Sequence, residues 1–163
     1  MDRLAGETGE TVTLAVPAGE EVLTLAQSDG RHFVASGNWA GVRTAPHCCS
    51  DGKVLLAFGA LGLQPGRLRR FARDTIVDRR ELARDLERVR SRRFAVCVSE
   101  LEEGLVGLAV PVRDDGTCIA ALCISGPAYR LDRDAIETFA PACLAAAEEL
   151  EQRLGATPHS GEE

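Results

Sequence analysis

The stretch His47-Cys48-Cys49-Ser50-Asp51-Gly52-Lys53-Val54-Leu55-Leu56-Ala57-Phe58 decides much of how this chain folds. It begins with small polar residues and a glycine, and it ends in an apolar run with helical spacing. We expect Ser50 or Asp51 to cap a helix at this point. The buried face of that helix should carry Val54, Leu55 and Phe58.

The start of such a helix is suited to binding an anion. Its first backbone N–H groups have no partner within the helix and carry a partial positive charge. Small side chains around them would let a carboxylate or a phosphate approach the backbone. An ordinary capped helix explains the stretch more simply, so the functional interpretation depends on the rest of the chain.

Composition and charge restrict the function classes. The 163 residues, 45% hydrophobic and 27% charged, predict one globular domain with a proper core. The net charge of −6 and the 4% aromatic content argue against this chain binding DNA or RNA by itself. We find no apolar run long enough to span a membrane and no signal peptide, so we expect a cytoplasmic location and no membrane partner.

The six cysteines favour free thiols over a disulfide framework or a metal site. They form no Cys-x-x-Cys pair, and two of them are adjacent, which is poor spacing for one tetrahedral metal. We therefore expect no metal and no cofactor. The cysteines are Cys48, Cys49, Cys97, Cys118, Cys123 and Cys143.

Periodicity predicts an α+β domain with four helices besides the one after His47, and six strands. The expected strands cover residues 11–16, 21–27, 31–36, 94–99, 105–112 and 117–125. The expected helices cover residues 1–8, 65–73, 78–92 and 132–155, with caps at Asp78 and Asp132 and an end at Gly155. Pro141 should either kink the last helix or mark a fresh start. We expect residues 156–163 to form a mobile tail.

The last two strands should form a hairpin through Asp114-Asp115-Gly116. A three-residue loop would place Gly107 opposite Cys123 and Leu105 opposite Ser125. The sheet would then have a face of bulky residues and a face of small residues. We expect helices on the bulky face. The small-residue face leaves room either for a ligand cavity or for a closely packed helix, and the pattern does not decide between them.

Several segments in register resemble the effector-binding domain of IclR-type transcriptional regulators. They are Leu4 to Val12, Pro46 to Phe58 with its His-x-x-x-x-Gly-Lys pattern, Leu101-Glu102-Glu103-Gly104-Leu105, Pro111-Val112-Arg113-Asp114 and Ile124-Ser125-Gly126-Pro127. The resemblance extends from about Leu4 to Leu154.

The resemblance implies a GAF/profilin-like domain: a mainly antiparallel six-stranded sheet with helices on both faces. In that family the domain senses a small organic acid and forms homodimers or tetramers. DNA is bound by an upstream winged helix-turn-helix domain, which this chain lacks. The implied organisation is the end of a linker helix at 1–8, the effector-binding domain at 9–155 and the tail at 156–163.

The resemblance also implies a ligand pocket. Ser50 and Asp51 fall where backbone amides at a helix start meet the ligand carboxylate. Cys97 falls where an acidic residue is usual, and Gly107 falls where cysteine is frequent, beside Val106 at a position that is usually arginine. The remaining expected pocket residues are Cys123 and Ser125, at positions that are often serine, and Phe33 in the apolar wall.

These departures predict a pocket with less charge and more thiols than is usual. We expect its ligand to be a more apolar acid, with aromatic acids included, rather than a very small keto acid. Asp51 would repel a bound carboxylate unless its side chain turns away.

Two other functions compete with the acid sensor. A thiol-based redox or metal sensor would use Cys97 and Cys123 with Cys48, Cys49 or His47, although buried structural thiols are the simpler interpretation. An enzyme would need a third residue to orient His47 beside the adjacent cysteines, and no such residue is evident. We therefore expect no catalytic residues.

Overall fold

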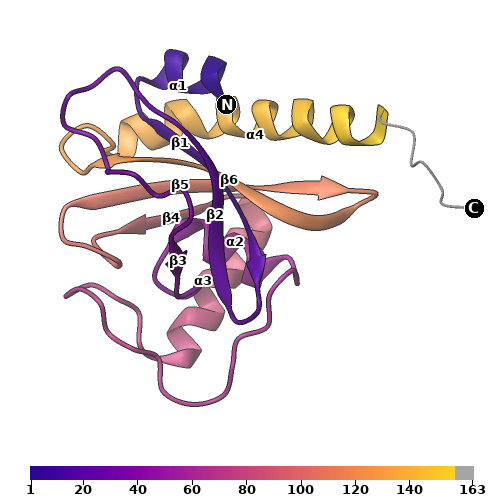
Figure 1. The fold of residues 1–163 in the computed structure, drawn as a ribbon. Coiled ribbons are helices and arrows are strands. Elements are labelled where there is room, and N and C mark those ends of the chain that lie inside the picture. Colours follow the sequence, from indigo (N-terminus) through magenta and orange to yellow (C-terminus); the bar gives the residue numbers. More distant parts are fainter. Residues whose placement is uncertain (157–163) are drawn as a thin grey trace, which may run out of the picture.

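The fold is a curled six-stranded antiparallel sheet with helices on both faces (Figure 1). The computed structural model describes residues 1–156. The strands are β1 (Thr11–Ala18), β2 (Glu21–Ser28), β3 (Arg43–Thr44), β4 (Ala95–Val98), β5 (Leu105–Asp114) and β6 (Thr117–Pro127). The helices are α1 (Asp2–Thr8), α2 (Ser50–Ala57), α3 (Arg79–Arg92) and α4 (Arg133–Ala156).

The strand order β3-β2-β1-β6-β5-β4 places the N-terminal and C-terminal strands at the centre. Every neighbouring pair is antiparallel. The α+β class and the antiparallel sheet that the sequence predicts are confirmed.

Two hydrophobic cores lie on opposite faces of the sheet. Helices α1 and α4 cover one face and pack on its bulky residues, including Leu108, Leu122 and Ile124. Helices α2 and α3 lie on the other face, where Ala109 and Ala121 belong to the second core. The predicted division into a bulky face and a small-residue face is therefore confirmed.

The N-cap of helix α2 lies one residue before Ser50, the first of the two expected caps. Cys49 is the N-cap, and no side chain caps the helix, so Ser50 and Asp51 occupy its first turn instead. Every residue of α2 is buried. Gly52 makes this packing possible, because a Cβ atom at that position would lie 2.3 Å from the carbonyl oxygen of Pro46.

The β5–β6 hairpin is shifted by two residues from the predicted register. Gly107 faces Ser125 and Leu105 faces Pro127. The turn has only two residues, Asp115 and Gly116, both with positive φ, and a bulge follows between residues 112 and 113. A shift of two leaves every side chain on its predicted face, since strands alternate with period two.

Two predicted elements are wrong. Residues 31–36 form no strand, and the sheet is completed instead by β3, which pairs with Val22 and Leu23 of β2. Residues 65–73 form no helix. That segment is held by Thr75, whose hydroxyl accepts hydrogen bonds from the backbone N–H groups of Phe71 and Ala72. Local side-chain bonding of this kind competes with helix formation.

The terminal helices agree more closely with the sequence. Asp132 accepts a hydrogen bond from the N–H of Ala135, as a cap does, and α4 continues through Pro141 in one element. It ends at Ala156, one residue after the expected end at Gly155. Of the expected tail, residues 157–163 lie outside the described part of the chain.

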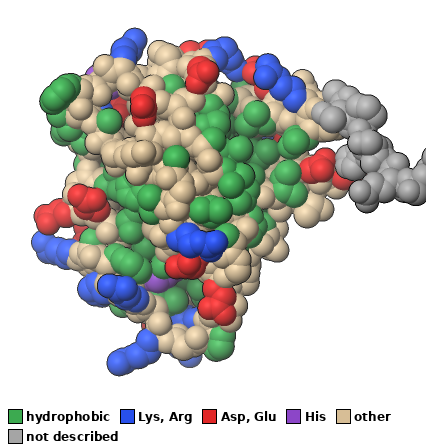
Figure 2. Space-filling model, viewed as in Figure 1, with side chains coloured by type: hydrophobic (Ala, Val, Ile, Leu, Met, Phe, Trp, Pro, Cys, Tyr) green, Lys and Arg blue, Asp and Glu red, His purple; other side chains and the backbone are tan. Residues whose placement is uncertain are grey.

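Charged side chains of both signs are intermixed on the surface. On the face in Figure 2, acidic and basic groups lie mostly toward the rim, and hydrophobic side chains gather nearer the centre. Within residues 1–156, no helix is both long enough and apolar enough to cross a membrane.

Replacement of Gly52 by alanine tests the contact between α2 and Pro46. The added methyl group would meet backbone atoms that cannot move aside, so we expect a loss of about 1–3 kcal/mol or more in the free energy of unfolding. Urea denaturation followed by circular dichroism measures this change.

Gly6→Ala is the matched control, because a Cβ atom there has no atom within 4 Å. Alanine in an exposed helical position should leave stability unchanged or raise it by up to about 1 kcal/mol. Equal stability of the two variants would contradict the close approach at Gly52.

Candidate functional site

One pocket opens on the small-residue face, beside the part of the sheet that α2 covers. Its volume is about 50 Å³, whereas one water molecule needs roughly 10–15 Å³. The lining residues come from all six strands, from the start of α2 and the residues just before it, and from the connections that follow β2 and β4. They are Thr13, Thr24, Trp39, Thr44, Cys48, Cys49, Ser50, Asp51, Cys97, Glu100, Leu101, Leu105, Gly107, Cys123 and Ser125.

The two interpretations of the small-residue face are both realised, in different places. Helix α2 packs closely over Ala109 and Ala121, while the pocket lies over Gly107, Cys123 and Ser125. The absent side chain of Gly107 keeps this space open, because a Cβ atom there would lie 2.5 Å from the Ser50 hydroxyl.

The structure brings six of the seven predicted site residues into this pocket: Ser50, Asp51, Cys97, Gly107, Cys123 and Ser125. The prediction that Phe33 lines the pocket is wrong. Its side chain is fully exposed, because residues 31–36 form a loop rather than a strand whose face could turn toward the pocket. Trp39, Leu101 and Leu105 supply the apolar wall instead.

The start of α2 forms one wall of the pocket. The N–H of Lys53 is the first in this helix to bind a preceding backbone carbonyl, that of Cys49, at 3.0 Å. The amides of the first turn therefore precede the helical hydrogen-bond ladder. The Ser50 hydroxyl lies 3.3 Å from the Cys123 sulfur and joins this wall to β6.

The carboxyl group of Asp51 shares this wall. Burial raises its pKa, and this effect is partly offset by the Cys49 thiol and by the N–H groups of Asp51 and Gly52. The raised pKa favours the protonated form, which lessens the repulsion that Asp51 would exert on a bound carboxylate.

A buried ion cluster stands directly behind the pocket. The ammonium group of Lys53, fully buried, lies 2.7 Å from Asp85 Oδ2 and 2.6 Å from Glu100 Oε1. Burial alone would lower the pKa of Lys53, but Cys97, Glu100 and Asp85 outweigh it and raise that pKa. Burial alone would raise the pKa of Asp85, but Lys53 and Arg88 outweigh it and hold that pKa below the usual value.

The thiols around the pocket are protonated. Burial raises the pKa of Cys48 to about 12, and it raises the pKa of Cys49, Cys97 and Cys123 as well. Neighbouring carboxyl groups add to the effect, and Lys53 opposes it only at Cys48 and Cys97. Thiols of this kind are poor nucleophiles, since the thiolate is the reactive form. Within residues 1–156, no group of His, Cys, Asp and Glu side chains is arranged to hold a metal ion.

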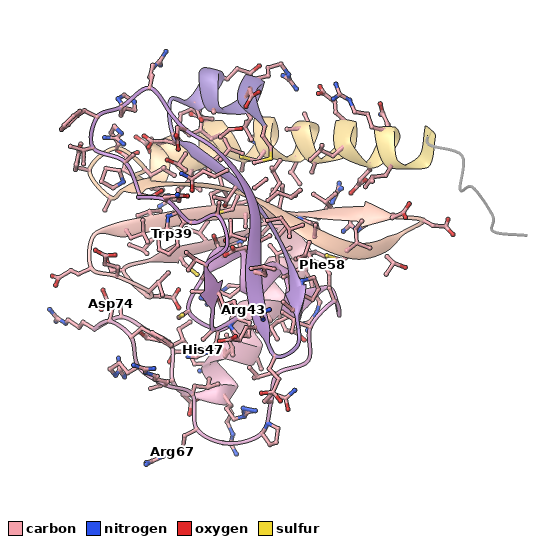
Figure 3. All side chains as sticks on the ribbon, in the orientation of Figure 1. Trp39, Arg43, His47, Phe58, Arg67 and Asp74 are labelled. Carbon is pink, nitrogen blue, oxygen red and sulfur yellow. The ribbon has the colours of Figure 1, made fainter. Side chains whose placement is uncertain are left out.

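A strap over the pocket supplies a wall residue that the sequence pattern did not predict. Residues 29–42 connect β2 to β3, and Figure 3 shows Trp39 on this segment. Gln27 anchors the strap by accepting a hydrogen bond from the Trp39 backbone N–H at 2.8 Å. The Ser36 hydroxyl lies 2.8 Å from that of Ser125. A single tryptophan among glycines was the available sequence signal for this wall.

Glu100 also lines the pocket and was not among the predicted site residues. It follows β4 and turns its carboxyl group back toward Lys53, so the pocket retains an acidic group despite cysteine at position 97. The expectation of a less charged pocket is therefore only partly met. The charge pattern in sequence could not reveal this, because Lys53 and Glu100 are 47 residues apart.

Comparison with known proteins places this geometry in a family. Residues 1–152 match the family described as bacterial transcriptional regulator IclR, C-terminal. The chain belongs to this IclR family. Its relatives are regulators of transcription rather than enzymes.

A curated IclR relative is the HTH-type transcriptional regulator BhcR of Paracoccus denitrificans, 31% identical over 99% of this chain. The chain spans about 60% of the length of that relative. IclR from Thermotoga maritima superimposes with a TM-score of 0.86 at 30% identity, covering 94% of this chain and 64% of that one.

A second solved relative is an IclR homologue from Microbacterium hydrocarbonoxydans in complex with 4-hydroxybenzoate. It superimposes with a TM-score of 0.82 at 29% identity, over 96% of this chain and 65% of that one. Residues 1–152 thus correspond to the C-terminal domain of this family, and residues 1–156, which the structure describes, contain no helix-turn-helix unit.

Lys53→Met tests the buried ion cluster. Methionine fills a similar volume but leaves Asp85 and Glu100 without their shared cation, so we expect a loss of about 3–5 kcal/mol in the free energy of unfolding. Chemical denaturation measures the loss. Arg133→Met is the control, because the Arg133–Glu137 pair is exposed and should change stability little. Similar losses in both variants would refute the importance of the cluster.

The reactivity of the thiols provides a second test. All six cysteines are buried, so Ellman's reagent at about pH 8 should react slowly with the folded protein and with all six thiols in guanidinium chloride. Rapid reaction of a native thiol at the pocket would contradict the raised pKa values and would restore the redox interpretation.

Proposed function

We propose that this domain binds a small organic acid in the pocket described above, and that it serves as the effector-sensing and oligomerisation domain of a transcriptional regulator. The observation that carries the proposal is that Ser50 and Asp51, in the first turn of α2, line the pocket. A helix start of this kind stabilises a carboxylate.

The rest of the pocket supports an acid with an apolar body. Trp39, Leu101 and Leu105 line it together with four protonated thiols, and no arginine side chain does so. The relative from Microbacterium hydrocarbonoxydans carries an aromatic acid. We infer that apolar acids, aromatic ones included, bind this chain more tightly than the smallest keto acids.

The proposed regulation requires more than this domain. DNA would be bound by a helix-turn-helix domain of the kind for which the curated relatives are named, and the sensor domains would associate as homodimers or tetramers. An acid could shift DNA binding only by favouring one of two arrangements of the assembly. We propose no enzymatic activity, because the relatives are regulators and the His47 ring binds the carbonyl oxygen of Arg69 rather than a nucleophile.

The thiol-based sensor is disfavoured. Such a sensor needs an accessible cysteine whose pKa is lowered, whereas burial raises the pKa of Cys48, Cys49, Cys97 and Cys123. The acid sensor requires only the pocket and the helix start. The expected cytoplasmic location and the division of the chain at residue 8 stay predictions.

Gly107→Ala tests where the acid binds. The added methyl group would enter the pocket and displace the Ser50 hydroxyl, so we expect it to weaken the binding of aliphatic and aromatic acids by about tenfold or more. Isothermal titration calorimetry against a panel from acetate and pyruvate to benzoate measures this effect.

Gly6→Ala adds the same methyl group on α1, in open space, and should bind each acid as the unaltered protein does. If no acid binds the unaltered protein, the proposed function is wrong. If Gly107→Ala binds with unchanged affinity, the acid binds elsewhere.

A further inference from the structure

Glu100 has one carboxylate oxygen engaged and one without a partner. The residue is 7% exposed. Its Oε1 accepts a hydrogen bond from Lys53 at 2.6 Å, whereas its Oε2 is buried and has no hydrogen-bond partner among the described residues. The Cys97 thiol, which is a weak donor, also interacts with this carboxyl group.

The position of this oxygen is fixed from two sides. Lys53 holds the side chain, and the Thr75 hydroxyl donates a hydrogen bond of 2.6 Å to the backbone carbonyl of Glu100. A carboxylate oxygen that is buried without a donor loses the hydrogen bonds that it would make in water. The group cannot relieve this cost by turning outward without breaking its bond to Lys53.

Glu100 also lies in the wall of the pocket, together with the first turn of α2. The helix start offers donors and partial positive charge, while Glu100 offers an acceptor. One small molecule in the pocket could therefore accept hydrogen bonds from the helix start and donate one to Glu100.

We propose that the ligand of this pocket is an acid that also carries a hydroxyl or N–H group, which donates a hydrogen bond to Glu100 Oε2. This inference rests on the proposed function, because it assigns the second recognition point of the same site. Glu100 is then a residue that determines specificity: it selects acids with a donor over acids of the same shape without one.

The charges of the neighbouring groups permit this assignment. Lys53 pairs with both Glu100 and Asp85, and Arg88 also pairs with Asp85, so two cations balance the two carboxylates and an anionic ligand does not face an uncompensated charge. On the strap, Trp39 lines the same pocket, and its indole N–H is also buried without a partner among the described residues. It supplies a donor for an oxygen of the ligand.

Glu100→Gln should replace the hydrogen-bond acceptor at the position of Oε2 by a donor. Lys53 is a donor only, so it would hold the amide oxygen of the glutamine and leave the amide N–H₂ group in the place of Oε2. A donor would then face the hydroxyl of the ligand. The hydroxyl would lose its charged acceptor, although it could still accept a bond itself.

The experiment compares acids that differ only in a hydroxyl group: lactate with propionate, and 4-hydroxybenzoate with benzoate. Isothermal titration calorimetry of the unaltered protein should show the hydroxy acid of at least one pair binding about tenfold or more tightly than its partner. In Glu100→Gln this ratio should fall to about threefold or less.

Asp85→Asn is the matched control. It perturbs the same ion cluster from the side of α3 and does not line the pocket, so the ratio should persist even if all affinities fall. Comparison of ratios within each variant removes any general weakening of the fold.

Equal affinities within both pairs for the unaltered protein would overturn this inference and leave the acid sensor intact. Binding of none of the four acids would overturn both. A ratio that survives in Glu100→Gln would assign the selection to another group. If Glu100→Gln does not fold, equal affinities within both pairs for the unaltered protein still overturn the inference.

Discussion

The buried contact of Lys53 with Asp85 and Glu100 joins the parts of the molecule that form the site. Lys53 comes from α2, Asp85 from α3 and Glu100 from the connection after β4. Removing a charge from water costs several kcal/mol, and the cost is recovered only where oppositely charged partners lie at hydrogen-bond distance. The three groups must therefore come together for α2 to pack fully buried against the sheet. That packing in turn fixes where the first turn of α2 lies.

The glycines at positions 52 and 107 complete the same arrangement. Gly52 lets α2 approach the backbone of Pro46, and Gly107 leaves space between β5 and Ser50. One glycine brings the helix close, and the other keeps the sheet clear beneath its start. The pocket results from these two approaches and from the ion cluster behind them, rather than from a large gap in the core.

The sequence predicted those features that depend on short-range periodicity. Alternation along β4, β5 and β6 identified both faces of the sheet, so Cys97, Gly107, Cys123 and Ser125 were correctly grouped. The register failed by two residues, because a loop of two or three residues fits Asp114-Asp115-Gly116 equally well until the bulge is seen. Phe33 and the strand at 31–36 failed because a short apolar run among glycines does not reveal whether a neighbouring strand is available. Glu100 and Trp39 could not be found from periodicity, since their positions depend on contacts between distant parts of the chain.

Alternate residues of the same strands have different roles, because one face of the sheet packs against helices and the other borders the pocket. In β5 and β6, Leu108, Leu122 and Ile124 bind the sheet to α1 and α4, while Gly107, Cys123 and Ser125 border the pocket. Neighbours along a strand point to opposite sides. Mutations at every second position can therefore alter which molecule is accepted while the side chains that keep the domain folded stay the same. A family built on this plan can diverge in the signals that its members detect while the architecture around those signals is conserved.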